Sequence, residues 1–245
     1  MAWLPPKYRP DMLEIMASST PFSYSELMSD SEVIPQYSFH GSKIEYLSSS
    51  AVLTVGDRAF EGCTEMKFIN LTKCTSVGQY AFSCGRTTYV DSVDVYLPLC
   101  TNIGANAFNN FRGTDNTADM IFPACTYVGQ NAFSHTSSYP LTVRSLQFPA
   151  VVTFGSSSMT RIIADTVDIG ENCTSMGSTP LANSTVTNLI VRATTPPTLG
   201  SSAGLGSNAT ITHIYVPSEA VSDYTDSTNY PRWAAYSSII SAISE

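Results

Sequence analysis

The sequence is poor in charged residues, and basic residues are the scarcest of them. Asp, Glu, Lys and Arg make up only 13% of the 245 residues, about half the share of an ordinary globular protein. The 12 Lys and Arg stand against 20 Asp and Glu, which gives a formal net charge of −8. A protein that binds nucleic acid or an anionic membrane through a basic surface has the opposite balance. We therefore expect no nucleic-acid partner.

Long apolar runs are also absent. No stretch approaches the ~18 consecutive apolar residues that a transmembrane helix needs, so no membrane insertion is expected. The first residues, from Met1 to Pro10, lack the basic start and apolar run of a secretory signal. Hydrophobic residues nevertheless make up 43% of the chain, which is enough for a substantial core.

Motifs of catalysis and metal binding are missing as well. The three histidines, His40, His135 and His213, have no second ligand at H-x-x-x-H or H-E-x-x-H spacing. No cysteine pair has the C-x-x-C spacing of zinc or redox sites. Neither a G-x-S-x-G elbow nor a G-x-x-x-x-G-K-[ST] phosphate loop is present. The sequence therefore predicts no catalytic residue, no metal site, no cofactor and no enzyme activity.

What the sequence does contain is a repeated pattern, aliphatic-Gly-x-x-Ala-Phe. Two later copies are degenerate, with Met159 and Leu181 in place of Phe. The six glycines lie 22, 26, 25, 26 and 22 residues apart. Self-similarity at such a period is typical of stacked structural repeats. The copies begin at Val55, Val77, Ile103, Val128, Phe154 and Met176.

A short run with apolar outer residues precedes each copy at a similar distance. Period-2 alternation indicates a strand with one buried face, and a proline follows in four copies, which ends the strand after about three residues. Such strands cannot bury their apolar face alone, so we expect them to stack into one parallel sheet over a shared core. The runs are 69–71, 95–97, 120–122, 146–148, 167–169, 189–191 and 214–216.

The twelve residues Leu97-Pro98-Leu99-Cys100-Thr101-Asn102-Ile103-Gly104-Ala105-Asn106-Ala107-Phe108 show the complete pattern. The chain thereby resembles the BspA-like, or Treponema pallidum-type, leucine-rich repeats over roughly residues 34–245. The resemblance implies a repeat solenoid, a right-handed leucine-rich-repeat coil with a parallel sheet of short strands. Within the coil, we expect the Phe of each copy to stack on the Phe of the neighbouring turns.

The two ends depart from the repeat pattern. Residues 1–33 are expected to form an N-terminal cap or an attachment segment, residues 34–204 the array, and residues 205–245 the last strand and a helical C-terminal cap. In the tail, Pro231 suits a helix start. An amphipathic helix over the last turn is predicted, with a partner-binding helix as the alternative. Its stripe would be Trp233, Tyr236, Ile239, Ile240 and Ile243.

Four of the six cysteines share one repeat position: Cys74, Cys100, Cys125 and Cys173. Val151 holds that position in the intervening copy, which indicates a small buried apolar site and predicts a column of buried free thiols. Adjacent turns lie ~4.8 Å apart, within the range of a disulfide. A disulfide between Cys74 and Cys100, or between Cys100 and Cys125, is therefore the alternative to free thiols.

Two candidate binding surfaces follow from the geometry of a coil. The middle residue of each run and the residue before the run face away from the core, which gives a sheet face. Three longer connections, after Phe82, Phe108 and Phe133, give a loop edge, which we favour slightly because insertions in repeats often form the binding side. A plain solvated surface is the alternative for both. The sheet-face residues are Phe68, Asn70, Tyr96, Ile121, Gln147 and Tyr215. The loop-edge residues are Arg86, Tyr89, Phe111, Arg112, His135 and Tyr139.

The sequence and the resemblance together predict a non-enzymatic recognition module that binds a cell-surface glycan or protein. BspA-like repeats are associated with bacterial surface adhesion, and the chain also resembles repeat proteins of phages of gut bacteria, which would serve as tail components. Because no secretion signal is visible and the chain opens with Met1, we expect an extracellular, virion-surface protein whose residues 1–33 contact other assembly proteins. A bacterial cell-surface adhesin and a purely structural scaffold or decoration protein are the alternatives.

Overall fold

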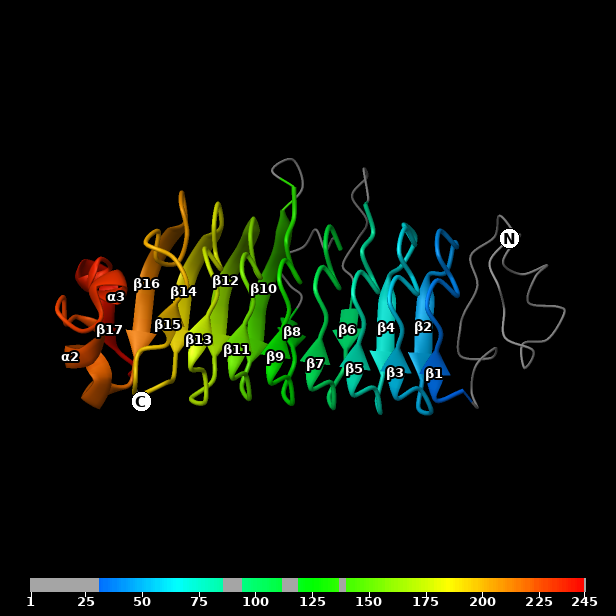
Figure 1. The fold of residues 1–245 in the computed structure, drawn as a ribbon, viewed down its shortest axis with the longest axis horizontal. Helices are drawn as coiled ribbons and strands as arrows, with labels where there is room; N and C mark the ends of the chain where they lie inside the picture. Colours follow the sequence, from blue (N-terminus) through cyan, green and yellow to red (C-terminus); the bar gives the residue numbers. More distant parts are fainter. Residues whose placement is uncertain (1–30, 86–93, 112–118, 137–139, 245) are drawn as a thin grey trace, which may run out of the picture.

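A computed structural model describes residues 31–85, 94–111, 119–136 and 140–244. In these residues the chain forms a solenoid, whose turns follow one another along the long axis of the molecule (Figure 1). Consecutive turns contribute neighbouring strands, and every strand pair is parallel. The predicted solenoid of stacked parallel strands is therefore confirmed.

The larger sheet has nine strands in the order β17-β16-β14-β12-β10-β8-β6-β4-β2. All seven predicted runs lie in its strands or directly at their ends. The strands are β2 (Tyr46–Ser49), β4 (Phe68–Leu71), β6 (Asp94–Tyr96), β8 (Asp119–Ile121), β10 (Leu141–Phe148), β12 (Ile162–Ile169), β14 (Thr185–Val191), β16 (Thr210–Val216) and β17 (Ile240–Ala242).

Strands β10, β12, β14 and β16 have seven or eight residues, so the prediction of about three residues for each strand of this sheet is wrong in this half of the coil. In β10 the buried residues Leu141 and Val143 precede a slip in the alternation, after which Leu146 and Phe148 are buried. At the slip, two consecutive residues, Arg144 and Ser145, separate the first pair of inward side chains from the second. The simple period-2 signal is therefore broken, which hid the strand extension in the sequence.

The second sheet has eight strands of two residues each, and the sequence predicted one sheet only. In the first of these strands the last residue is Ile34 before Pro35, in the others it is the apolar residue before the repeat glycine, and in all of them it is buried in the core. The glycine itself is required because a Cβ on Gly104 would lie 2.7 Å from the carbonyl carbon of Gly78 in the preceding turn. The strands are β1 (Val33–Ile34), β3 (Thr54–Val55), β5 (Ser76–Val77), β7 (Asn102–Ile103), β9 (Tyr127–Val128), β11 (Thr153–Phe154), β13 (Ser175–Met176) and β15 (Thr198–Leu199).

A column of stacked phenylalanine rings fills the interior, as predicted. The ring centroids of successive members are 5.1, 5.2, 5.3 and 5.2 Å apart, and their planes lie within 15° of parallel. Met159 and Leu181 occupy the same repeat position further along the coil and are fully buried. The ring column consists of Phe39, Phe60, Phe82, Phe108 and Phe133.

The residue two before each column residue adopts the left-handed backbone conformation, with φ between 51° and 59°. Side chains other than Gly, Asn and Asp adopt it at a cost. This conformation is kept because backbone hydrogen bonds join neighbouring turns of the coil. Arg58 N, for example, donates to Gln79 O at 2.8 Å. The residues are Tyr37, Arg58, Tyr80, Asn106, Asn131, Ser157 and Thr179.

The C-terminal segment caps the coil with short elements: η1 (Ser218–Ala220), α2 (Val221–Tyr224), α3 (Pro231–Ala234) and η2 (Ser237–Ile239). The helix does start at Pro231, but the predicted stripe through Ile243 is wrong because the helix ends at Ala234. The chain then pairs with β16 as β17, with Ile240 beside Ile214. Pairing satisfies the backbone groups of an otherwise open sheet edge. Within the described residues, no helix reaches the length and apolarity that crossing a membrane takes.

Candidate functional site

The outer face of the nine-stranded sheet carries its side chains in straight rows. Strand register places the middle residues of the runs beside one another, one per turn, from β2 to β17. Five of the predicted sheet-face residues belong to this row, and Phe68 lies in the parallel row two residues earlier. The row, called the ladder below, is Ser48, Asn70, Tyr96, Ile121, Gln147, Asp168, Ile190, Tyr215 and Ser241.

Tyr96 and Ile121 form the apolar centre of the ladder. They are direct partners in the β6–β8 register and are 54% and 39% exposed, respectively. Large apolar side chains with this exposure contact water in the isolated chain, and burying them against a partner is favourable. Asp94 and Asp119, the exposed residues two positions before them, flank the pair with carboxylates.

Hydrogen bonds fix the polar side of this centre. Arg144 donates to both carboxylate oxygens of Asp119, with Nε at 2.9 Å from Oδ1. The Ser145 hydroxyl donates to the same Oδ1 at 2.7 Å and accepts from Gln147 Nε2 at 2.9 Å. The bonds from Arg144 and then Ser145 hold the pKa of Asp119 below its usual value. Gln147 in the ladder is therefore oriented by a chain of bonds that ends on a carboxylate.

A second bidentate pair lies further along the ladder. Arg192 donates to the two carboxylate oxygens of Asp168 at 2.8 and 2.7 Å, and this bond raises the pKa of the guanidinium. At the other end of the sheet, Lys67 Nζ donates to Glu45 at 2.6 Å. Ion pairs thus neutralise charge on both sides of the Tyr96–Ile121 centre.

Two predicted loop-edge residues are buried, so the prediction that they are exposed contacts is wrong. Phe111 is 2% exposed, and its ring packs edge-on against Phe108 with centroids 5.4 Å apart. His135 is also 2% exposed, with Nε2 at 2.7 Å from the Phe111 carbonyl oxygen and Nδ1 at 2.8 Å from that of Phe133. Phe111 lies three residues after Phe108, as the buried Cys63 does after Phe60, and His135 lies two residues after Phe133, as the buried Cys84 does after Phe82.

The other loop-edge residues, Arg86, Tyr89, Arg112 and Tyr139, lie outside the described residues. Their role in binding stays a prediction. The sheet face is therefore the candidate surface that the described residues build.

The predicted column of buried free thiols is confirmed for Cys74, Cys100, Cys125 and Cys173. All four donate to a backbone carbonyl two residues ahead, as Cys125 does to Tyr127 O at 3.3 Å. Burial raises the pKa of Cys125 and of Cys173 to about 12. Cys125 and Cys173 are therefore structural, since thiols this buried and this weakly acidic are poor nucleophiles and poor metal ligands.

A groove that the sequence did not predict lies beside the C-terminal cap, between residues 171–174, 193–199 and 229–233. Two features of the sequence could have indicated it. Pro196 and Pro197 stand in a lengthened corner of the coil, and Tyr230 and Trp233 stand close together in the non-repeating tail.

Comparison with known families gives a match to the BspA type leucine rich repeat region, in six copies, over residues 17–140 and 101–226. No curated protein matches the sequence.

Proposed function

Because the chain belongs to the BspA-type leucine-rich repeat family, we propose that it is a non-enzymatic recognition module of an extracellular surface. Repeat arrays of this family are often surface-exposed or protein-binding modules. In this proposal the target is a cell-surface protein or glycan, and the contact surface is the outer face of the nine-stranded sheet.

The pairing of Tyr96 with Ile121 is the observation that carries the proposal. Tyrosines at the centre of a patch contribute a large part of interface energies. The backbone beneath this pair is held on both sides by parallel strands, so binding orders few groups and loses little entropy. The apolar centre lies beside the exposed Asp94, whereas Asp119 is already paired with Arg144. This arrangement suits a protein surface with an apolar centre and a basic group at one edge.

The test is binding of the labelled chain to a panel of gut bacterial and host cells, measured by flow cytometry. Tyr96→Ser with Ile121→Ser is expected to weaken binding at least tenfold. The matched control is Tyr127→Ser with Val152→Ser, because Tyr127 and Val152 are 43% and 38% exposed on the eight-stranded side. Equal losses in both variants, with unchanged thermal melting, would contradict the sheet face as the contact surface.

The loop edge is tested in the same assay. Arg86→Ala, Tyr89→Ala, Arg112→Ala and Tyr139→Ala are combined in one variant. If this variant abolishes binding while the Tyr96/Ile121 variant retains it, the contact surface is the loop edge, and the recognition function stands.

We place the module on a virion, as a phage tail component, in line with the resemblance to phage-encoded repeat chains. A bacterial cell-surface adhesin is the second carrier. Immunogold labelling of purified virions and of intact producing cells distinguishes the two. Wild-type chain that binds no cell of the panel would favour a structural scaffold or decoration protein.

A further inference from the structure

A bipartite groove lies where the last turns of the coil meet the C-terminal cap. Its two halves, of about 320 and 440 Å³, share Pro196, Thr198 and Tyr230 as lining residues. Each volume lies in the range of small-molecule binding sites. The groove lies in other turns of the coil than the Tyr96–Ile121 centre. It is formed at the corners after β12 and β14, whereas the centre lies on the outer face of β6 and β8.

The groove lies where the last three corners of the coil before the cap lengthen in turn. Residues 149–152 connect β10 with β11, residues 170–174 connect β12 with β13, and residues 192–197 connect β14 with β15. Each corner is thus one residue longer than the one before. The later corners cannot stack flush on the earlier ones, and the cap covers only part of the step between them.

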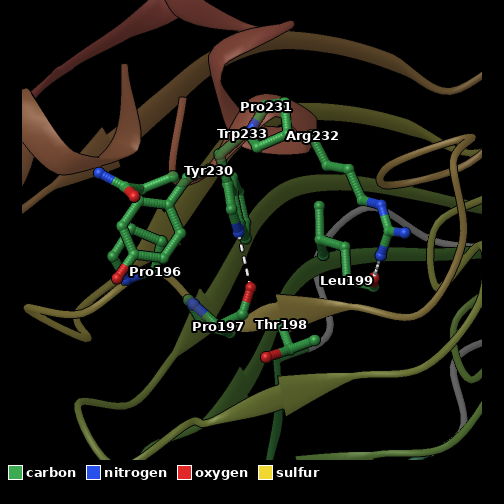
Figure 2. A pocket seen from close by; sticks show the side chains of 9 residues that line it. Pro196, Pro197, Thr198, Leu199, Tyr230, Pro231, Arg232 and Trp233 are labelled. Carbon is green, nitrogen blue, oxygen red and sulfur yellow. Dashed lines mark hydrogen bonds between the residues drawn. The ribbon is translucent and has the colours of Figure 1, made fainter. Parts of the chain in front are cut away.

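Three side chains of the cap bond to carbonyl oxygens of the last corner and of β15. Tyr224 Oη donates to Ala193 O at 2.9 Å, and Trp233 Nε1 donates to Pro197 O at 2.7 Å. Arg232 reaches across the groove to Leu199 O (Figure 2). Tyr224 and Trp233 are at most 1% exposed. The wall is therefore held in place before any ligand arrives, which lowers the entropic cost of binding.

The two halves differ in chemistry. Figure 2 shows the apolar half, where Tyr230 stands beside the prolines of the corner and of α3. The other half is lined by a carboxylate, an amide and hydroxyls, and among the described residues that line it none is basic. The one basic residue that the structure describes in the lining of the groove, Arg232 in the other half, is bonded to Leu199 O, and the chain has a net charge of −8, so the polar half disfavours an anionic ligand. The polar lining side chains are Glu171, Asn172, Thr174, Thr194, Thr195 and Thr198.

We propose that this groove binds a neutral oligosaccharide. One sugar ring lies with its C–H face on the ring of Tyr230, whose negative π face attracts the weakly positive C–H groups. Its hydroxyl groups bond to Glu171, to the Asn172 amide and to the threonine hydroxyls, which together supply both donors and acceptors. The site does not rest on the function proposed for the sheet face, and either can fail without the other.

Saturation-transfer NMR on the full chain tests the proposal with five probes: triacetylchitotriose, cellotriose, maltotriose, mannotriose and the acidic 3′-sialyllactose. We expect transfer to at least one neutral trisaccharide and none to 3′-sialyllactose. The proposal is overturned if no neutral probe gives a signal, if only 3′-sialyllactose binds, or if decaproline displaces the bound sugar and binds the groove more tightly.

Variants then locate the binding. Tyr230→Ala is expected to raise the Kd of the bound trisaccharide at least tenfold, but Tyr230 also packs against the core. Glu171→Gln with Asn172→Ala is therefore the second variant, since both residues are exposed, and the same tenfold rise is expected with unchanged melting. Tyr127→Ser, an exposed tyrosine on the eight-stranded sheet, is the matched control. Unchanged binding in the Glu171/Asn172 variant, or an equal loss in the control, overturns the proposal.

Discussion

The rings of Phe108 and Phe133 stack with their centroids 5.2 Å apart and their planes 6° from parallel. Phe82 stacks on the other side of Phe108 at 5.3 Å, and Phe111 closes the ring edge at 5.4 Å. Phe108 therefore has aromatic neighbours on both faces and one edge. The packing of the interior is continuous through these contacts, so a side chain that is shortened in one turn also removes contacts from the next turn.

Phe108→Ala is expected to lower the free energy of unfolding by about 3–5 kcal/mol, as for other buried phenylalanine truncations. The stacked neighbours are fixed by their own turns and cannot collapse into the cavity. Urea unfolding followed by circular dichroism measures the loss. Phe108→Met is the control and should lose less, because Met159 fills the same repeat position. A loss below about 1 kcal/mol for Phe108→Ala would contradict a packed column.

Gly129→Ala should also destabilise the chain, by roughly 1–3 kcal/mol as in other overpacked sites. A Cβ at Gly129 would lie 2.6 Å from both Ala105 N and Gly104 C. These are backbone atoms of the preceding turn, so no side chain can move aside. Thermal melting compares the variant with Gln130→Ala, which changes the exposed neighbour. Identical melting of the two variants would show that the turns have room for a methyl group here.

The stacking of the coil was predictable because its causes recur in phase. Each turn needs a glycine at the close approach, a large apolar residue in the column and an outward residue between two inward ones. Those requirements fix the position of Phe108 inside and of Tyr96 outside. The rows of the candidate sheet face follow from the same phase, and the structure places the predicted residues in them.

The features that sequence reasoning missed occur once, or carry too short a signal. Strands of two residues, such as β5, show no alternation to read. Phe111 lies three residues after Phe108, where other turns have the buried residues Cys63 and Ile162, but these three side chains are too unlike to mark the position in the sequence. The tail has apolar residues at helical spacing, yet Ile240 joins a strand because the edge of β16 needs a partner. The groove at the cap likewise depends on corner lengths in successive turns.

Thr179→Asn is expected to stabilise the chain by about 1 kcal/mol, a part of the cost of left-handed backbone for a residue with Cβ. Thr179 has φ of 51°, and a β-branched residue is strained there. Asparagine already occupies the equivalent position as Asn106 and Asn131. The substitution gives up only a 3.3 Å contact with the Ser157 hydroxyl. Urea midpoints are compared with Ser178→Asn, at the preceding residue; a midpoint for Thr179→Asn no higher than wild type would contradict stored strain at this turn.

The Arg144–Asp119 pair should make stability depend on pH in the acidic range. The pKa of Asp119 is lowered in the folded chain by the bonds from Arg144 and Ser145, so the pair contributes above the ordinary carboxyl pKa and its contribution is lost as pH falls through the lowered value. The pair is largely exposed, so its contribution at neutral pH is below about 1 kcal/mol. Melting of wild type and Asp119→Asn should differ at pH 7 and converge near pH 2. If the difference in melting temperature between wild type and Asp119→Asn grew as pH falls, it would contradict a lowered pKa of Asp119 in the folded chain.

The redox state of the cysteine column determines whether neighbouring turns are held together by packing alone or also by covalent bonds. Cys74, Cys100, Cys125 and Cys173 are buried free thiols, and burial raises the pKa of Cys125 to about 12. At pH 8 such a thiol is almost wholly protonated and out of reach of reagent, so alkylation requires opening of the coil. Protein purified without reductant and treated with iodoacetamide should therefore show the four peptides unmodified when folded and modified in guanidinium.

The matched control for this measurement is Thr126→Cys, an exposed position beside Cys125, which should be alkylated in the folded protein within minutes. If the Cys74 and Cys100 peptides stay unmodified in guanidinium until a reductant is added, the two residues form a disulfide between adjacent turns. Stability would then include a covalent term, and the effect of Phe108→Ala would have to be measured under reducing conditions, because a bridge between neighbouring turns limits how far the unfolded coil can open.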